Sequence, residues 1–468
     1  MNSKSKDRLR RTLLIFNNTN GQQDGNNYGK KYLKRIFVSG FISLILLLII
    51  IYTLPKTVLS VSSLFEYATI VALVIFLFIL LIRYFTILAM AYLYLNEYTF
   101  KSKNSFHPFV SIIIPVYNEE KVIKESIRSL LELNYNNYEI IIVNDGSTDN
   151  TKKVAEELVG FRKGKYSEIK ISLINKPNGG KASALNYGIK VSDAEYVLCM
   201  DGDSQLSPDS IKMAVRHFTN PEIGAVAGNV KVLNRRKFIT DLQALEYIEG
   251  LNMARSAQSF VKLVNIIPGP IGLFRKKAIQ QAGYYSSDTF AEDADLTLKI
   301  LASGWKIYYE PKSISYTEAP EKIQQLLKQR YRWTRGIIQS IKKHKKLMIN
   351  PTINFGDTII LWMMFYEALI WPAMNIAANL FFIIAAVFFG FSSLLFFWWA
   401  GLALLDLITA LYCIAVEKEE IRLIGYAIIY RMFFILIIDI CKAMSTIEEF
   451  LGIKMGWGKL ERLGAAKI

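Results

Sequence analysis

Long apolar segments near both ends of the sequence constrain this chain more than any other feature. Five segments are apolar and long enough for a membrane crossing: residues 36–54, 65–95, 359–389, 391–416 and 423–441. At about 1.5 Å per residue, about nineteen residues reach across the hydrocarbon core of a bilayer. The interval between the second and third segments is charged and rich in turn residues. The sequence therefore predicts a water-exposed domain inserted between two groups of transmembrane helices.

The basic N-terminus sets the predicted orientation. Residues 1–35 carry nine Lys or Arg, whereas the link at 55–64 carries a single lysine. The positive-inside rule then predicts a basic cytosolic tether over residues 1–35 and two transmembrane helices within residues 36–99. Residues 100–319 would follow as a cytosolic domain. We expect Arg83, inside the second apolar segment, to extend its long side chain to the inner face of the membrane.

The C-terminal segments leave one question of topology open. Residues 357–445 contain three apolar segments, and three crossings would place the C-terminus outside the cell. The tail at 446–468 is basic and favours the cytosol, which a double or re-entrant pass of the first segment, interrupted at Pro372, would allow. Three charged side chains inside these segments either line a polar pore or lie near the membrane boundary: Asp406, Arg431 and Asp439.

Strands and helices alternate in the first part of the cytosolic domain. Short β-rich apolar runs occur at residues 110–114, 138–143, 169–174 and 196–200, and helical patterns at 120–133, 151–159 and 181–189. Continuous apolar strands that alternate with helices predict a parallel sheet covered on both faces, as in α/β proteins.

A polar cluster follows each of these strands. The clusters read PVYNE from Pro115, NDGS from Asn144, NGGK from Asn178 and DGD from Asp201. Ligands bind at the carboxyl edge of open α/β sheets, so four clusters at that edge predict one site. Gly, Asn and Asp also terminate strands for conformational reasons alone, so each cluster by itself is ambiguous.

The residues in these clusters suit a diphosphate better than other ligands. Neither GxGxxG nor GxxxxGK[ST] is present, which disfavours dinucleotide enzymes and P-loop NTPases. The three cysteines and three histidines are scattered, which disfavours a zinc site. Asp201 and Asp203 suit a hard divalent cation. Lys181 begins a predicted helix, where a phosphate could lie against the backbone N–H groups, although a solvated lysine would read the same way.

Two further motifs follow in the sequence. Glu292 and Asp293 stand in an acidic cluster, AEDAD, before a helical run; they either cap that helix or supply a general base. Residues 320–356 form a basic amphipathic region that is predicted to lie on the membrane surface. Within it, QRYRW places Gln329, Arg332 and Trp333 on one helix face, where they could meet a diphosphate and a sugar or simply anchor the interface.

The ordered set of motifs resembles the processive family 2 glycosyltransferases: cellulose, chitin and hyaluronan synthases, and especially bacterial poly-N-acetylglucosamine synthases. The tail MGWGKLER from Met455 is similar to tails in the hyaluronan and poly-N-acetylglucosamine enzymes. The PGPIG run from Pro268 favours the N-acetylglucosamine branch over the glucose branch. The resemblance implies a GT-A, Rossmann-like α/β fold and an inverting transfer from a UDP-sugar.

The resemblance also implies roles for individual residues. Asp293 would be the catalytic base, and Asp203 would bind Mg²⁺ or Mn²⁺. The remaining residues would bind substrate. Tyr117, Glu119 and Asp145 would hold the uridine, and Lys181 and Asp201 would contact the nucleotide. Gln329 and Arg332 would meet the diphosphate, and Trp333 would lie under the acceptor sugar.

The resulting hypothesis is a multi-pass plasma-membrane enzyme that polymerises a sugar, UDP-N-acetylglucosamine being the favoured donor, and passes the polysaccharide through its own helices. Its partners would be the UDP-sugar, the growing polysaccharide, membrane lipids and, as a candidate, a small accessory membrane subunit. A non-processive enzyme that adds one sugar to a lipid carrier is the alternative, but such enzymes usually lack the QxxRW motif. The net charge of +16 does not indicate nucleic acid, because the basic clusters at 1–35 and 321–346 both adjoin predicted membrane segments.

Overall fold

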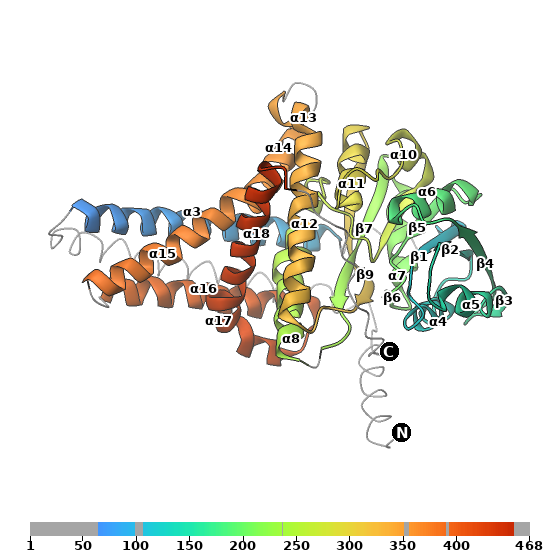
Figure 1. Cartoon of the computed structure of the whole chain (residues 1–468), viewed down its shortest axis with the longest axis horizontal. Helices are drawn as coiled ribbons and strands as arrows, with labels where there is room; N and C mark the ends of the chain where they lie inside the picture. Colours follow the sequence, from blue (N-terminus) through green and yellow to red (C-terminus); the bar gives the residue numbers. More distant parts are fainter. Residues whose placement is uncertain (1–63, 99–105, 236, 351–354, 390–392, 454–468) are drawn as a thin grey trace, which may run out of the picture.

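A computed structural model describes residues 64–98, 106–235, 237–350, 355–389 and 393–453. The predicted tether at 1–35, the predicted crossing at 36–54 and the MGWGKLER tail lie outside these residues. Residues 106–349 contain every residue that the motifs predict for catalysis and substrate binding, and for that reason we call them the catalytic domain. They form one unit around a central sheet, and long helices extend from it to one side (Figure 1).

The sheet has nine strands in the order β3-β4-β2-β1-β5-β8-β7-β9-β6. The strands are β1 (Val110–Val116), β2 (Tyr138–Asp145), β3 (Gly160–Lys163), β4 (Glu168–Lys176), β5 (Tyr196–Cys199), β6 (Gln205–Leu206), β7 (Ile223–Val232), β8 (Gly272–Arg275) and β9 (Lys306–Thr317). Strands β4, β2, β1 and β5 pair in parallel, as the alternation of strands and helices predicted. The rest of the sheet is mixed, because β3, β8 and β6 run antiparallel to their neighbours.

Alternation along the strands divides the core between the two faces of the sheet. Ile112 and Ile114 of β1 pack with α4 (Ile123–Leu131), whereas Ile113 packs on the other face with α6 (Lys181–Val191). Successive side chains of a strand point to opposite faces, so a fully apolar strand is buried on both sides. The other helices of the catalytic domain are α5 (Thr151–Glu156), α7 (Ser210–Val215), α8 (Phe238–Glu246), α9 (Met253–Phe260), α10 (Lys276–Gln281), α11 (Glu292–Ala302), α12 (Ile323–Lys343) and α13 (Lys345–Ile349).

Four helical segments of the described chain are long and apolar enough to cross a membrane: residues 71–95, 355–388, 398–417 and 421–450. They indicate a multi-pass membrane protein. The first lies within α3 (Leu64–Tyr98), the second joins α14 (Phe355–Phe365) to α15 (Trp371–Phe389), the third lies within α16 (Ser393–Glu417), and the fourth ends in α18 (Ile435–Phe450). The second segment continues through Pro372 as one helix and makes no double pass, because a π-helical turn at Tyr366–Ile370 precedes the proline.

Charged side chains meet inside this helical part of the molecule. Arg83 donates two hydrogen bonds to Glu367, at 3.0 and 3.1 Å, and its guanidinium lies 4.7 Å from the ring centre of Trp371. The partner carboxylate comes from a helix distant in sequence, a contact that the sequence did not predict. Asp406 accepts a hydrogen bond from Tyr84 and pairs with Arg431 at 3.2 Å.

The link between α16 and the last helical segment fastens these helices to the catalytic domain. Lys231 of β7 lies 3.3 Å from Glu417 and 2.9 Å from Glu419, and Arg235 also pairs with Glu419. All four side chains are buried or nearly so. Burial by itself would raise the pKa of Glu419, but Lys231 and Arg235 outweigh it and hold this pKa at about 2.

We expect Glu419→Gln to lower the free energy of unfolding by about 2 kcal/mol. Breaking one partner out of a buried ion cluster costs about 3–5 kcal/mol, and Glu417 would still neutralise Lys231 here. Because the pKa of Glu419 is lowered on folding, this contribution is present above pH ~4.3 and is lost as the pH falls toward 2. Thermal unfolding in detergent measures the effect. Glu420→Gln is the matched control, since Glu420 pairs with the half-exposed Arg422 and its loss should cost less than about 1 kcal/mol.

Candidate active site

The DGD cluster lies against the PVYNE cluster at the carboxyl edge of the sheet. Strand β5 ends at Cys199, and Asp201 and Asp203 follow within four residues. A Cβ atom on Gly202 would lie 3.1 Å from Val116 Cγ1 and 3.3 Å from the Pro115 carbonyl oxygen. A larger residue would therefore push the two turns apart. The Asp203 side chain is buried, whereas Asp201 keeps about a quarter of its side chain exposed.

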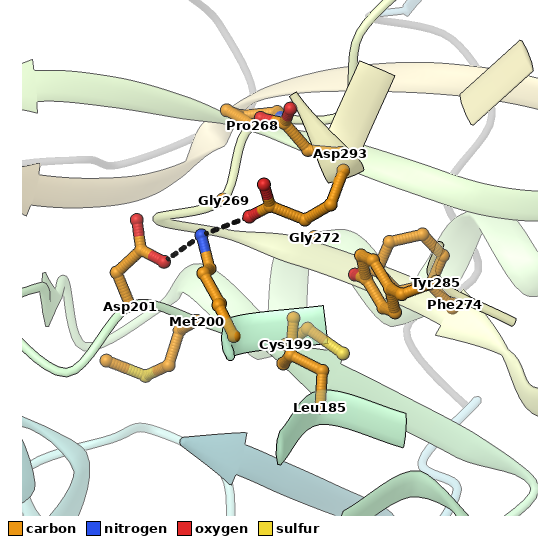
Figure 2. Close-up of a pocket in the computed structure, with 12 residues that line it drawn as sticks. Leu185, Cys199, Met200, Asp201, Pro268, Gly269, Gly272, Phe274, Tyr285 and Asp293 are labelled. Carbon is orange, nitrogen blue, oxygen red and sulfur yellow. Dashed lines mark ion pairs between the residues drawn. The ribbon is translucent and has the colours of Figure 1, made fainter. Parts of the chain in front are cut away.

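Lys181 joins two carboxylates from distant parts of the chain. Gly180 has φ +84°, a conformation that lets the loop after β4 turn directly into α6, so Lys181 is the first residue of that helix. The Lys181 ammonium lies 2.6 Å from Asp201 Oδ1 and 2.9 Å from Glu292 Oε1, and Figure 2 shows both ion pairs. Burial opposes the charge on Lys181, but the two carboxylates outweigh it and raise its pKa.

The acids of the AEDAD cluster lie in three different environments. Glu292 is buried and paired with Lys181. Asp295 is fully buried and contacts Lys343 and His344 at the end of α12; burial opposes its charge, but these partners hold its pKa below the usual range. Asp293 is partly exposed, and its Oδ1 accepts a hydrogen bond from the Ala294 N–H at 2.8 Å.

Asp293 therefore differs from its neighbours in having no direct ion pair among the described side chains. Burial and the nearby Glu292 charge raise its pKa to about 6, against the opposing effect of Lys181. A carboxyl group with a pKa near neutrality can accept a proton at physiological pH and is suited to act as a general base.

A pocket joins Asp293 to the Lys181 ion pairs. Its lining includes Asp201, Glu292 and the turn at Pro268 and Gly269. A Cβ atom on Gly269 would lie 2.8 Å from Lys181 Nζ and 3.0 Å from Asp201 Oδ2, so a larger residue would displace the ends of these side chains. Thr297 supports the arrangement: its hydroxyl donates to the Asp293 carbonyl and accepts from the Ile267 N–H.

The other predicted substrate residues lie in the loops beside this pocket. Asp145 pairs with Lys176 and accepts hydrogen bonds from the N–H groups of Gly179 and Gly180, at 3.0 and 2.8 Å. Its carboxylate thus holds the loop that delivers Lys181. Tyr117 is 38% exposed, and the Glu119 N–H donates to Thr151 Oγ1, which ties the PVYNE turn to α5.

The QRYRW motif lies in the first half of α12. Gln329 is buried and accepts a hydrogen bond from Arg330, whose guanidinium stacks 4.2 Å from the ring centre of Trp333 and pairs with Glu246 of α8. Arg330, which the sequence did not single out, therefore positions both Gln329 and Trp333. Arg332 is partly exposed, and among the described side chains no ion pair of Arg332 is found.

Helix α12 packs directly on the segment that carries Asp293. A Cβ atom on Gly336 would lie 2.4 Å from the Ala291 nitrogen. Gln339 accepts a hydrogen bond from the Phe290 N–H at 3.1 Å and donates one to Glu449 of α18. Sequence analysis missed Gly336 and Gln339, because nothing in the pattern indicates which face of α12 meets residues 290–291.

The carboxylates of the DGD cluster fit a divalent cation that also binds substrate. No group of three or more metal-ligating side chains converges within the described ranges. Mg²⁺ is usually held by one or two carboxylates together with substrate phosphates and water, so two carboxylates such as Asp201 and Asp203 would be enough in number. Their hard oxygen donors exclude a site that selects a soft metal.

Comparison with known proteins agrees with this geometry. Residues 111–283 match the family described as glycosyl transferase family 2. A poly-beta-1,6-N-acetyl-D-glucosamine synthase of Staphylococcus epidermidis is 34% identical over 237 residues, which are 50% of this chain and 56% of that protein. A synthase of the same name from Staphylococcus aureus strain COL is 35% identical over 228 residues, 48% of this chain and 54% of that protein. The chain thus matches about half the length of these curated relatives.

A solved structure supports the fold. The mannosyltransferase of Pyrobaculum calidifontis, determined in complex with GDP-Man and Mn²⁺, superposes with a TM-score of 0.57 at 18% identity and covers 84% of this chain and 100% of that chain. The mixed sheet with acidic clusters at its carboxyl edge thus has a GT-A-like fold. Residues 111–283 belong to glycosyltransferase family 2, related to the poly-N-acetylglucosamine synthases, as the motifs predicted.

We expect Gly336→Ala to destabilise the packing of α12 on residues 290–291. Backbone atoms block the new methyl group, and overpacking of this kind costs about 1–3 kcal/mol. The unfolding midpoint in detergent should fall, and protease should cut between α12 and α11 sooner. Gly425→Ala is the control, because a Cβ atom there meets no heavy atom within 4 Å. Equal midpoints for the two variants would contradict the close packing at Gly336.

Proposed function

We propose that this protein is an inverting glycosyltransferase of the plasma membrane that polymerises N-acetylglucosamine from UDP-N-acetylglucosamine on the cytosolic side. The observation that carries the proposal is the difference between the two acids at the start of α11. Glu292 pairs with Lys181, whereas Asp293 forms no ion pair with any described side chain and has a pKa of about 6. The identity to poly-beta-1,6-N-acetyl-D-glucosamine synthases supports the choice of donor.

The donor would lie across the carboxyl edge of the sheet. Tyr117 and Glu119 are proposed at the uridine end. Asp145 would contribute by holding the loop before Lys181 rather than by a free carboxylate, since its oxygens already accept three partners. Once a divalent cation binds the Asp201 carboxylate, the Lys181 ammonium would be released from Asp201 and could pair with the diphosphate. A bound Mg²⁺ or Mn²⁺, held by Asp201 and Asp203, would stabilise the negative charge on the departing UDP.

The acceptor hydroxyl would approach from the side of Asp293. Its proton would pass to an Asp293 carboxylate oxygen as the hydroxyl oxygen bonds to the anomeric carbon and the bond from that carbon to the UDP oxygen breaks. A single displacement of this kind inverts the anomeric configuration. Ala294 N–H orients the carboxylate, and the Thr297 bridge fixes the backbone of Asp293 relative to the Pro268 turn.

The QRYRW motif would bring the donor diphosphate and the acceptor sugar next to the membrane helices. Gln329 and Arg332 are proposed to contact the diphosphate, and Trp333 to stack against the acceptor sugar. Arg330 contributes rigidity, because it bonds Gln329 and covers the Trp333 ring. The polymer would then leave between helices that already bury polar groups, as a polar chain requires in hydrocarbon.

The experiment that tests the proposal is turnover by the purified full-length chain. With Mg²⁺ or Mn²⁺ and a panel of UDP-sugars, we expect UDP release and a high-mass product from UDP-N-acetylglucosamine alone. Asp293→Asn should bind UDP normally, but its turnover rate should fall by a factor of about 10²–10⁴, because the amide accepts no proton. Asp203→Ala should lose activity together with its metal dependence.

Each other outcome of this experiment has a definite meaning. A short lipid-linked product would assign the protein to the single-sugar transferases. A different preferred donor would overturn the N-acetylglucosamine assignment, and full activity of Asp293→Asn would remove that residue from catalysis.

The pH dependence of turnover provides a separate prediction. Because Asp293 acts only when deprotonated and its pKa is about 6, kcat/KM should rise with pH through about 6 and level off above it. Glu292→Gln removes a neighbouring negative charge, so the midpoint of the remaining activity should move to lower pH. Glu222→Gln, an exposed partner of Lys306 outside the pocket, should leave the midpoint in place. An unchanged midpoint in Glu292→Gln would contradict the assignment of this titration to Asp293.

A further inference from the structure

The segment at residues 421–450 is apolar enough to cross a bilayer, yet both of its ends are bonded to the catalytic domain. Near its start, Arg422 donates hydrogen bonds to both carboxylate oxygens of Asp241 in α8, at 2.8 and 3.1 Å. Near its end, Glu449 accepts a hydrogen bond from Arg335 of α12 at 2.8 Å. A helix that crosses a membrane has its ends on opposite sides, which these contacts do not allow.

Contacts along the length of α18 lead to the same conclusion. Cys441 lies 3.5 Å from the Leu327 carbonyl oxygen, Glu448 meets Tyr331, and the Ile453 carbonyl accepts a hydrogen bond from Arg335. The contacts advance along both helices together, so α18 runs parallel to α12.

Helix α12 is itself fixed to the catalytic domain from one end to the other. Arg330 pairs with Glu246, Gly336 packs on Ala291, and His344 at its end meets Asp295 at 3.0 Å. In Figure 1, α12 and α18 run upright, whereas α3, α15 and α16 extend sideways from the catalytic domain. Helix α18 therefore lies across the direction of the other long apolar helices.

The face of this segment that points away from the protein is a continuous apolar stripe. Its members recur every three or four residues, and their exposure ranges from 39% at Ile429 to 71% at Leu451. We call this set the α18 stripe: Ile429, Phe433, Ile437, Ile440, Met444, Ile447 and Leu451. The opposite face is buried, and there Asp439 accepts a hydrogen bond from Asn375 of α15. Such a helix, apolar on one face and bonded to a soluble domain on the other, is typical of membrane interfaces.

We propose that residues 421–450 form an interfacial helix that lies in the plane of the membrane, with the α18 stripe inserted among lipids at the boundary between headgroups and acyl chains. The described crossings are then α3, the α14–α15 helix and α16, and residue 453 lies on the same side of the membrane as the catalytic domain. Lipid is the proposed occupant because α15 and α16, which extend from the same domain as membrane-spanning helices, also expose large apolar side chains, among them Leu380, Ile383 and Leu404. The proposal does not depend on the donor or on the reaction.

Spin-label depth measurements in lipid vesicles test the proposal on the full-length chain. Phe433, Ile440 and Ile447 are each replaced by cysteine, one at a time, in the Cys441→Ala protein, and the new cysteine is spin-labelled. The Cys441→Ala protein without an added cysteine is the control, since it shows how far the two buried native cysteines are labelled. An in-plane helix predicts three similar, shallow depths. A crossing helix predicts depths that change by about 10 Å for every seven residues.

Helix α16 offers the matched control for a crossing. Labels at Phe396, Leu404 and Leu411, which are also exposed, should show the change of depth that the α18 labels lack. A gradient along α18 equal to that along α16 would overturn the proposal. Spin–spin coupling between copies at Ile440, with no access of lipid-soluble quencher, would show a second copy on the stripe and would overturn the lipid assignment.

A second measurement does not depend on labelling of α18. A protease site after residue 468 should be cut in vesicles whose catalytic domain faces outward, and it should be protected in vesicles of the opposite orientation. Protection of the site while the catalytic domain is digested would place the C-terminus across the membrane and would overturn the proposal.

Discussion

The ion pairs of Lys181 with Asp201 and Glu292 organise the catalytic domain. They join the first residue of α6, the turn after β5 and the first residue of α11, which come from both the parallel and the mixed part of the sheet. Removal of Lys181 would leave two buried or half-buried carboxylates without their cation, which would be costly in this environment. The same arrangement occupies Glu292 and leaves Asp293 as the acid with an unusual proton affinity.

Helices α12 and α18 support the chain segment that leads into Glu292 and Asp293. Gln339 bonds both the Phe290 N–H and Glu449, so the end of α18 is two hydrogen bonds away from the segment that carries Asp293. The link at residues 417–422 makes a second attachment, through the buried ion pairs of Lys231 and through the half-exposed Arg422, which pairs with Asp241. These contacts connect the position of α18 to the position of Asp293, the proposed base.

The sequence predicted the parts of this structure that depend on local pattern. The four parallel strands and the polar turns after them follow from apolar runs that alternate with helices, so Lys181, Asp201 and their neighbours could be placed at one edge in advance. The ordered motifs also identified the family. Which carboxylate pairs with Lys181 could not be predicted, because Glu292 is 111 positions away in the chain and only the packing of α11 brings it close. Hydropathy likewise could not distinguish α18 from α16, since apolar content records how much of a helix avoids water and not the direction of its axis.

The π-helical turns carry a consequence for how this chain tolerates change in length. Three such turns, at Tyr247–Asn252, Tyr366–Ile370 and Tyr430–Phe434, each hold a charged residue: Glu249, Glu367 and Arg431. A π-helical turn holds one residue more than an α-helical turn, and each extra residue rotates all that follows by about 100° about the helix axis. Deletion of one residue from the turn at Tyr366–Ile370 would rotate α15, which follows it, so that Asn375 no longer faces Asp439. No other residue would have been replaced. Related chains that differ in length at these turns would therefore present different helix faces to one another, and an alignment that ignores the turns would compare residues that point in different directions.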